Sequence, residues 1–305
     1  MRANISWARF GGRSLAVTSI HPWREQPEPA YAWWKWSWHW STVIGVAVLA
    51  LAYLLATTRW RARLGGPARF ERGRAVLFFS SLVVVLGSLN GPLHDLSDQY
   101  FFWTHMVQHL VLAQIFPLLF LLGIPAWLAD RLLANPRVTR AWNHLADYRI
   151  GFLLYTSVFT LWHFPPLYNL MMRDHSVHIV MHLLTMACAT IMWWPFVGTA
   201  SRAKKLEPPA QLLYVLVLST PMMVVAAFLT FARTPLYEWY ALAPRLWGMS
   251  AVEDQRFGAL LMWIPGTFVY WTVLSVIFLR WGHTRENTAR QDDMVIPRMP
   301  ATGER

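Results

Sequence analysis

The sequence predicts an all-α integral membrane protein that folds as a seven-transmembrane helix bundle. Hydrophobic residues make up 55% of the 305-residue chain and charged residues only 14%, a balance far from that of a soluble domain. Seven apolar runs are each long enough to cross a bilayer, which takes roughly 20 residues. The sequence shows no alternating ten-residue barrel pattern. We therefore expect helical spans, whose backbone groups are satisfied within each segment.

The predicted spans fill most of the chain. They cover residues 36–57, 75–93, 100–128, 150–171, 177–197, 211–232 and 258–280. This pattern divides the chain into an external N-terminal tail (1–32), a membrane domain (33–280) and a cytoplasmic tail (281–305). Prolines inside several spans, among them Pro117 and Pro265, predict kinks because each removes a backbone hydrogen bond.

The basic residues predict the orientation of the bundle. Loops 58–74, 129–149 and 198–210 carry six, four and three Lys or Arg residues, and the segment from Arg280 onward carries five. By the positive-inside rule these segments are cytoplasmic, which places the N-terminus outside and the C-terminus in the cytoplasm. Because the basic residues are spread over loops, the net charge of +11 indicates topology rather than a surface for nucleic acid.

Aromatic residues mark the outer end of the first span. The run YAWWKWSWHW (31–40) holds five Trp and one Tyr, which is typical of an aromatic belt at headgroup level. We assign His39 to this belt. His94 and His175 fall in short external loops, where solvated rings are expected. The single cysteine, Cys188, excludes a disulfide within the chain and a CxxC metal carrier.

The histidines carry most of the functional information. Eight of the eleven lie between residues 94 and 182. The stretches HMVQH (105–109) and HIVMH (178–182) each place two histidines four residues apart, on one face of a helix. With the predicted topology, the fourth span brings one more histidine to a similar depth. The sequence thus predicts one cavity in the outer half of the membrane, lined by His105, His109, His163, His178 and His182.

This pattern favours ligation of a metal ion or a haem. A single intramembrane histidine is more often a hydrogen-bond donor between helices. Five at one depth are costly unless they face a functional cavity. Imidazole suits zinc, copper, iron and nickel, and a thioether sulfur would favour Cu(I). The secondary ligand candidates are Met106, His94, Asp98 and Met262. Helical geometry turns Met106 about 100° away from its neighbour His105, which weakens its candidacy.

Several stretches together resemble the CtaG family of assembly factors for caa3-type cytochrome c oxidases, which are seven-span membrane proteins. The matching stretches are HMVQHLVLAQIFPLLFLLGIP (105–125), LWHFPPLYNL (161–170), VHIVMH (177–182), WWP (193–195) and DQRFGALLMWIPG (254–266). The resemblance covers roughly residues 40–280, and the family's histidines fall on the same five positions. Two departures are visible: Met181 stands where relatives commonly have an acidic residue, and a glycine pair is reduced to Gly258.

The resemblance implies a function without enzymatic turnover. Such a protein would bind copper, as Cu(I), at the outer histidine cluster and assist its delivery to subunit I or II of a nascent haem-copper oxidase of the respiratory chain. Its partners would be that oxidase, an external copper donor and membrane lipid, with no nucleic acid. Its location would be the bacterial cytoplasmic membrane. The alternative is an electron-transfer protein whose histidines hold a haem as two axial ligands. A desaturase-like oxygenase fits less well, because the cluster is external and has no HxxHH spacing.

Overall fold

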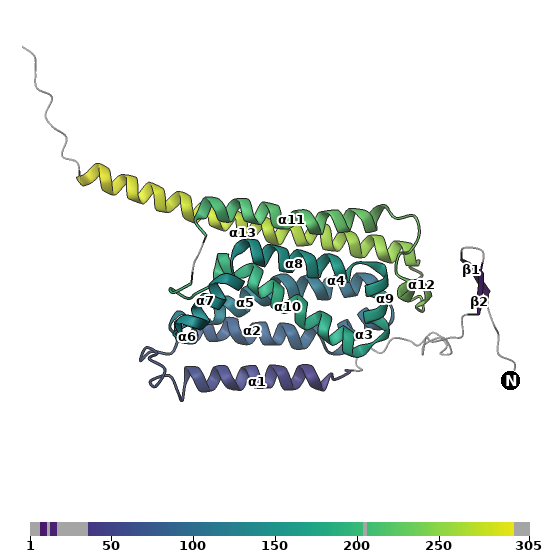
Figure 1. Ribbon diagram of the computed structural model, residues 1–305, viewed down its shortest axis with the longest axis horizontal. Helices are drawn as coiled ribbons and strands as arrows, with labels where there is room; N and C mark the ends of the chain where they lie inside the picture. The colour runs from purple at the N-terminus through teal and green to yellow at the C-terminus, as the bar shows by residue number, and fades with distance from the viewer. Residues whose placement is uncertain (1–6, 11–12, 17–35, 204–205, 296–305) are drawn as a thin grey trace, which may run out of the picture.

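Helices build the whole membrane part of the chain (Figure 1). The computed structural model describes residues 7–10, 13–16, 36–203 and 206–295. Near the N-terminus, β1 (Trp7–Phe10) and β2 (Arg13–Ala16) form a short antiparallel pair. Every regular element that follows among the described residues is helical. Most of the predicted N-terminal tail and the last ten residues of the predicted cytoplasmic tail, 296–305, lie outside the described residues.

The long helices run side by side, and shorter ones cover the two ends (Figure 1). At one end lie α3, α9 and α12; at the other lie α6, α7 and the segment that joins α1 to α2. The helices are α1 (Trp40–Thr57), α2 (Arg72–Ser88), α3 (Gly91–Gln99), α4 (Phe102–Leu110), the π-helix η1 (Val111–Ile115), α5 (Phe116–Gly123), α6 (Ala126–Leu132), α7 (Pro136–Leu145), α8 (Tyr148–Trp162), α9 (Pro165–Arg173), α10 (His175–Val197), α11 (Pro208–Phe231), α12 (Glu238–Leu242) and α13 (Ala251–Val295).

The apolar helices indicate a multi-pass membrane protein. Among the described residues, five segments are long and apolar enough to cross a bilayer: Trp40–Thr57, Phe102–Gly123, His175–Val197, Pro208–Phe231 and Ala251–Thr288. A sixth is formed if α2 and Pro92–Gln99, which are bent by 44° relative to each other, count as one span. The predicted count of seven is not confirmed, because α8 has only 15 residues. The orientation of the two termini also stays a prediction.

Two predicted boundaries are wrong, and proline explains the first. The fourth span was expected to run unbroken over 150–171, but α8 ends at Trp162 and α9 begins at Pro165. A residue that precedes proline avoids the helical region, and Phe164 is extended accordingly, with ψ 124°. The last span was expected at 258–280, yet α13 begins at Ala251 and continues to Val295, past the end of the bundle that carries α6 and α7 (Figure 1).

The predicted disturbance at Pro117 takes the form of a π-helical turn. The segments α4, η1 and α5 form one continuous span, and η1 ends two residues before Pro117. Proline has no N–H to donate to the carbonyl four residues earlier. That carbonyl, of Ala113, accepts a hydrogen bond from the indole Nε1–H of Trp193 at 3.0 Å. A side chain of α10 therefore satisfies a backbone group of the α4–α5 span, as buried polar groups in a membrane require.

The N-terminus of α4 is held by a carboxylate from the far end of the sequence. Asp254, in the first turn of α13, accepts hydrogen bonds from the backbone N–H groups of Phe102 and Trp103, both at 3.0 Å. These N–H groups have no partner within a helix, and they favour negative charge. A Cβ on Gly258 would lie 2.5 Å from the Phe102 ring, so the glycine allows α13 and α4 to approach this closely.

Replacing this carboxylate should destabilise the bundle. We expect Asp254→Ala to lower the free energy of unfolding by at least about 2 kcal/mol, because two buried N–H donors lose their acceptor. Glu253→Ala is the matched control: its neighbouring carboxylate is exposed, and its loss should cost no more than about 1 kcal/mol. Unfolding of the full chain in detergent measures both, and equal losses would contradict the assigned role of Asp254.

Candidate metal centre

Two helices and one helix end carry the five predicted histidines. The helix α4 carries His105 and His109, and α10 carries His178 and His182. His163 is the residue directly after α8, and its backbone carbonyl accepts a hydrogen bond from the Tyr237 hydroxyl at 3.0 Å. The four-residue spacing places each helical pair on one face, as predicted. The structure brings all five residues together.

The distances between rings on different helices suit a shared ion. The ring centroids are 5.5 Å apart for His105 and His178, and 5.5 Å for His109 and His182. His163 lies 6.4 Å from His109. Metal–nitrogen bonds of about 2.0–2.1 Å place the centroids of two imidazoles on one ion roughly 5–6.5 Å apart. The cross-helix pairs fall in this range.

The buried faces of these histidines lack protein partners. Both ring nitrogens of His105 are buried without a hydrogen-bond partner among the described residues, and the side chain is 0% exposed. The Nε2 atoms of four further rings are also buried without a hydrogen-bond partner among the described residues: His109, His163, His178 and His182. Each unsatisfied buried polar atom costs about 1–3 kcal/mol. A group of this kind at one place is a feature of binding sites rather than of structural cores.

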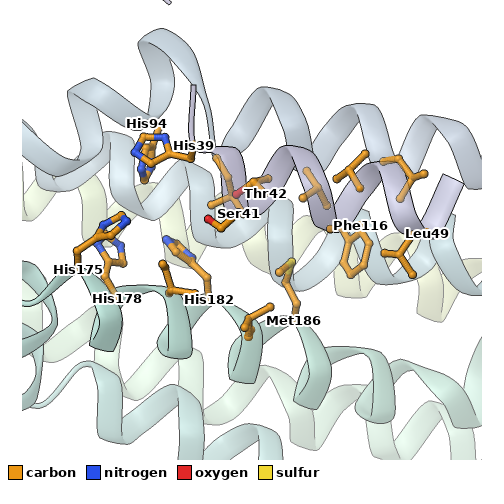
Figure 2. Close-up of a pocket in the computed structure, with 17 residues that line it drawn as sticks. His39, Ser41, Thr42, Leu49, His94, Phe116, His175, His178, His182 and Met186 are labelled. Carbon is orange, nitrogen blue, oxygen red and sulfur yellow. The ribbon is translucent and has the colours of Figure 1, made fainter. Parts of the chain in front are cut away.

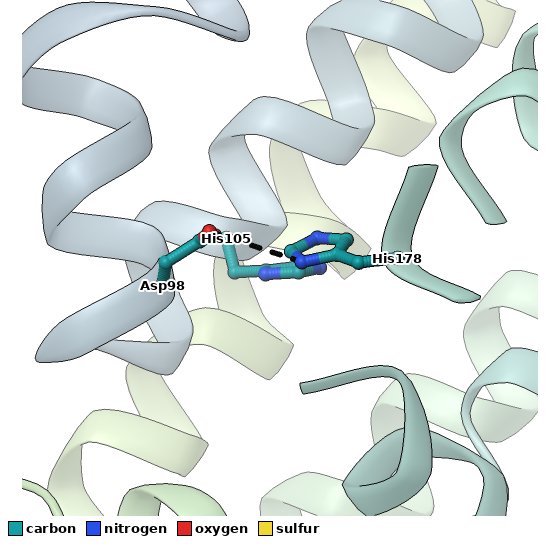
Figure 3. Close-up of side chains that lie close together, drawn as sticks. All are labelled: Asp98, His105 and His178. Carbon is teal, nitrogen blue, oxygen red and sulfur yellow. Dashed lines mark ion pairs between the residues drawn. The ribbon is translucent and has the colours of Figure 1, made fainter. Parts of the chain in front are cut away.

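An acidic side chain completes a compact set of ligand atoms at the outer edge of the cluster. One ligand atom each from Asp98, His105 and His178 lies within 4.8 Å of the other two (Figure 3). The carboxylate Oδ2 of Asp98 is 3.8 Å from Nδ1 of His178. Two ligands bound to one ion at usual lengths stand at most about 4 Å apart. A shift of under about 1 Å would therefore close these groups around an ion.

Hydrogen bonds fix which nitrogen of His163 is free. Its Nδ1 lies 2.7 Å from the carbonyl oxygen of Phe159. A carbonyl only accepts, so Nδ1 carries the proton of the neutral ring. The lone pair is then on Nε2, the buried atom without a partner. An outer hydrogen bond of this kind orients a metal-binding histidine.

The same argument gives His94 a different role. Nε2 of Gln108 donates to the carbonyl of Ser88 at 2.6 Å, which fixes the orientation of the amide. Its second hydrogen faces Nδ1 of His94 at 3.0 Å. The proton of His94 is therefore on Nε2, which lies 3.3 Å from Oδ2 of Asp98. Both nitrogens of His94 have partners, so this ring positions Asp98 instead of offering a free lone pair.

A cavity of about 200 Å³ opens beside the cluster, between α1 and α10 (Figure 2). Its polar end is lined by His39, His94, His175, His178 and His182, and apart from Ser41 and Thr42 the rest is apolar. The expectation of a solvated His94 is wrong, since this ring is only 5% exposed. Sequence reasoning also missed His39, which was assigned to the aromatic belt. The tryptophans around it gave no signal of its contact with His94, whose ring centroid is 4.2 Å away.

The family model described as cytochrome c oxidase caa3 assembly factor (Caa3_CtaG) matches residues 51–284. The chain belongs to this family. The resemblance inferred from the histidine motifs is thereby confirmed, and cytochrome c oxidase assembly is the process that the family serves.

The curated relatives of this family member are longer proteins. An uncharacterized protein of Mycobacterium bovis is 22% identical over 304 residues, which cover 93% of this chain and 45% of the relative. One from Mycobacterium leprae is 23% identical over 262 residues, with 81% and 39% coverage. The chain thus spans less than half the length of these relatives. No solved structure matches it.

The two methionines that the sequence offered as ligands belong to the hydrophobic core, whereas Met186 lines the cavity beside His182 (Figure 2). Met106 is 0% exposed and Met262 is 3% exposed, and both belong to the hydrophobic core. Met181, also in the core, accepts a hydrogen bond from the Thr185 hydroxyl at 3.8 Å. Neither Met106 nor Met262 is among the described residues that line the cavity. The compact set of ligand atoms at the site, from Asp98, His105 and His178, consists of imidazole and carboxylate groups.

The two tautomers can be measured directly. In the metal-free, ¹⁵N-histidine-labelled protein at neutral pH, we expect His163 to carry its proton on Nδ1 and His94 on Nε2, because carbonyl and amide partners impose these forms. Imidazole ¹⁵N shifts distinguish them. Gln108→Leu should release the preference of His94 alone, whereas Gln114→Leu, a buried glutamine further along the same span, should leave both unchanged. The opposite tautomer at either ring would refute the assignment.

Proposed function

We propose that this assembly factor binds copper at the five-histidine cluster, with Asp98 at its outer edge, and delivers the ion to a nascent cytochrome c oxidase. One observation carries the proposal. Two nitrogens of His105 and one each of His109, His163, His178 and His182 are buried without a hydrogen-bond partner among the described residues. In an apolar bundle, a bound cation would satisfy one lone pair on each of these five neutral rings together; the second nitrogen of His105 carries the proton of its ring.

The chemistry of the ligands suits transfer rather than storage. Neutral imidazoles bind copper, and the set contains no thiolate that would hold the ion more strongly. His109 stands between His182 and His163, with ring centroids 5.5 and 6.4 Å away, and these rings offer only nitrogen, whereas Asp98, His105 and His178 form a compact mixed set. We propose Cu(I) as the transported state. Copper is here a cargo, and its delivery requires no enzymatic turnover.

The partners follow from the family and from the place of the cavity. Membership in an oxidase assembly family makes the oxidase itself a partner. We propose that the receiving part is subunit I or II, that an external donor supplies the copper, and that the protein resides in the bacterial cytoplasmic membrane. The cluster histidines lie in the first turns of α4 and α10 and directly after α8, next in the chain to α3 and α9. The helices α3 and α9 lie at the opposite end of the bundle from α6 and α7, which carry three arginines (Figure 1). Together with the positive-inside rule, this arrangement supports an outer-side site.

The haem alternative fits the geometry less well. A bis-histidine haem needs a flat space between two rings that is wide enough for the macrocycle. Ligand pockets for drug-sized molecules measure about 300–1,000 Å³. The cavity of about 200 Å³ is smaller, and the rings of His105 and His178 are 5.5 Å apart with neighbouring imidazoles of the cluster on either side.

Copper titration of the purified full-length protein tests the proposal. We expect wild-type protein to compete with a Cu(I) chelator for at least one ion, and His105→Ala with His178→Ala to lower the affinity by about 100-fold or more, because two ligands are lost. The control replaces His144 and His283 by alanine; both are exposed and outside the cluster.

The same samples distinguish the alternatives. A visible Soret band in the wild-type protein would support the haem function instead. Wild-type protein without copper affinity under reducing conditions, or full oxidase maturation in cells that carry the His105→Ala and His178→Ala variant, would contradict the proposed copper delivery.

A further inference from the structure

The segment before α1 is fastened to α3 by three hydrogen bonds. The backbone N–H of Gly91 donates to the carbonyl of Ser37 at 3.0 Å, and the Ser37 hydroxyl donates to Asp95 at 2.5 Å. The backbone N–H of His39 donates to Oδ1 of Asn90 at 2.7 Å. This contact fixes the position of His39 although α1 itself packs loosely: only 11% of its span is buried.

His175 faces His39 across the mouth of the cavity (Figure 2). It is the first residue of α10, whose N-terminus is capped by Asp174 through the backbone N–H groups of Ser176 and Val177. The two ring centroids are 5.8 Å apart. This spacing lies within the roughly 5–6.5 Å that two imidazoles on one ion adopt. His175 is exposed, and Nδ1 of His39 is buried without a hydrogen-bond partner among the described residues.

The exposure of the histidines decreases from the mouth inward. His175 is exposed and His39 is half-buried. His178 and His182, which line the same cavity, are 5% and 6% exposed, and His105 behind them is 0% exposed. The ring of His94 lies 4.2 Å from His39 and 6.1 Å from His178, so imidazoles continue from the mouth to the interior.

We propose that His39 and His175 form a capture site, which takes up the cuprous ion at the cavity mouth and passes it to His178. The inference rests on the proposed copper function and adds a site that the family does not define, since His39 precedes the matched residues 51–284. The transfer is a ligand exchange: one copper–nitrogen bond forms as another breaks, and the oxidation state does not change.

Two ligands near solvent suit a transient site. They hold the ion more weakly than the buried groups, which offer three or more ligands, so the equilibrium favours inward transfer. His175 and His178 stand three residues apart on α10 and line the same cavity, so a captured ion is held beside the next ligand. Confinement of this kind corresponds to an effective concentration in the millimolar range, far above the micromolar copper of a binding experiment. The capture site should therefore affect the rate of loading more than the final occupancy.

Loading kinetics provide the test. The full-length protein is mixed with a coloured Cu(I)–bicinchoninate complex, and the loss of colour reports copper uptake. We expect His39→Ala with His175→Ala to slow uptake by about tenfold or more, because the effective concentration is lost. The final copper stoichiometry and the affinity should stay within about twofold of wild type, because the buried ligands are intact. The matched control is again the pair His144→Ala and His283→Ala.

A second measurement observes the capture site itself. In protein that carries alanine at all five cluster positions (His105, His109, His163, His178 and His182), we expect residual weak copper binding, which disappears when His39 and His175 are also replaced. Copper uptake at the wild-type rate by the His39→Ala and His175→Ala variant would overturn the proposal. So would a loss of copper affinity in that variant as large as the loss caused by His105→Ala with His178→Ala. Absence of copper binding by the wild-type protein is a different result, because it rejects the proposed function together with the capture site.

Discussion

The carboxylate of Asp254 is the contact on which the site depends. The first N–H groups of α4 lie inside an apolar bundle, where water cannot pair with them, so the helix begins where this acceptor stands. His105 follows one turn after that start and His109 one turn later, and both positions are therefore set by α13. Gly258 contributes by removing the side chain that would separate the two helices. The metal candidates on α4 are thus placed by a residue that binds no metal.

The polar groups around the cluster have two separate tasks. Some use their polar atoms in contacts with other protein groups. Gln108 is hydrogen-bonded to Ser88 and His94, and His94 in turn faces Asp98. Others are left with free lone pairs, as at His105. The paired groups fix the orientation of the unpaired ones, which keeps the free nitrogens aimed at one region. Such pre-organisation lowers the cost of ordering the ligands when an ion arrives.

Local periodicity predicted the two facing walls of the site, and long-range contacts decided the rest. The four-residue spacing of His105 and His109 needs only the geometry of one helix, so it was readable from the sequence. The cap on Phe102 comes from a residue 152 positions away, and no local pattern indicates such a partner. The contact of His39 with other histidines was missed for a similar reason, because its neighbours in sequence are tryptophans while histidines adjoin it in space. The end of α8 was missed although Pro165 gave a local signal.

The hydrogen bond from Trp193 to the carbonyl of Ala113 has a mechanical consequence. It ties the last turns of α10 to the middle of the span that contains α4, below both histidine pairs, so these two walls cannot slide along each other without exposing an unpaired carbonyl. Half of each of these spans is buried, against 11% for Trp40–Thr57. We therefore expect the pair α4 and α10 to act as a rigid frame. Any widening of the cavity would come from movement of α1, which lines one side of the cavity, relative to α4 and α10.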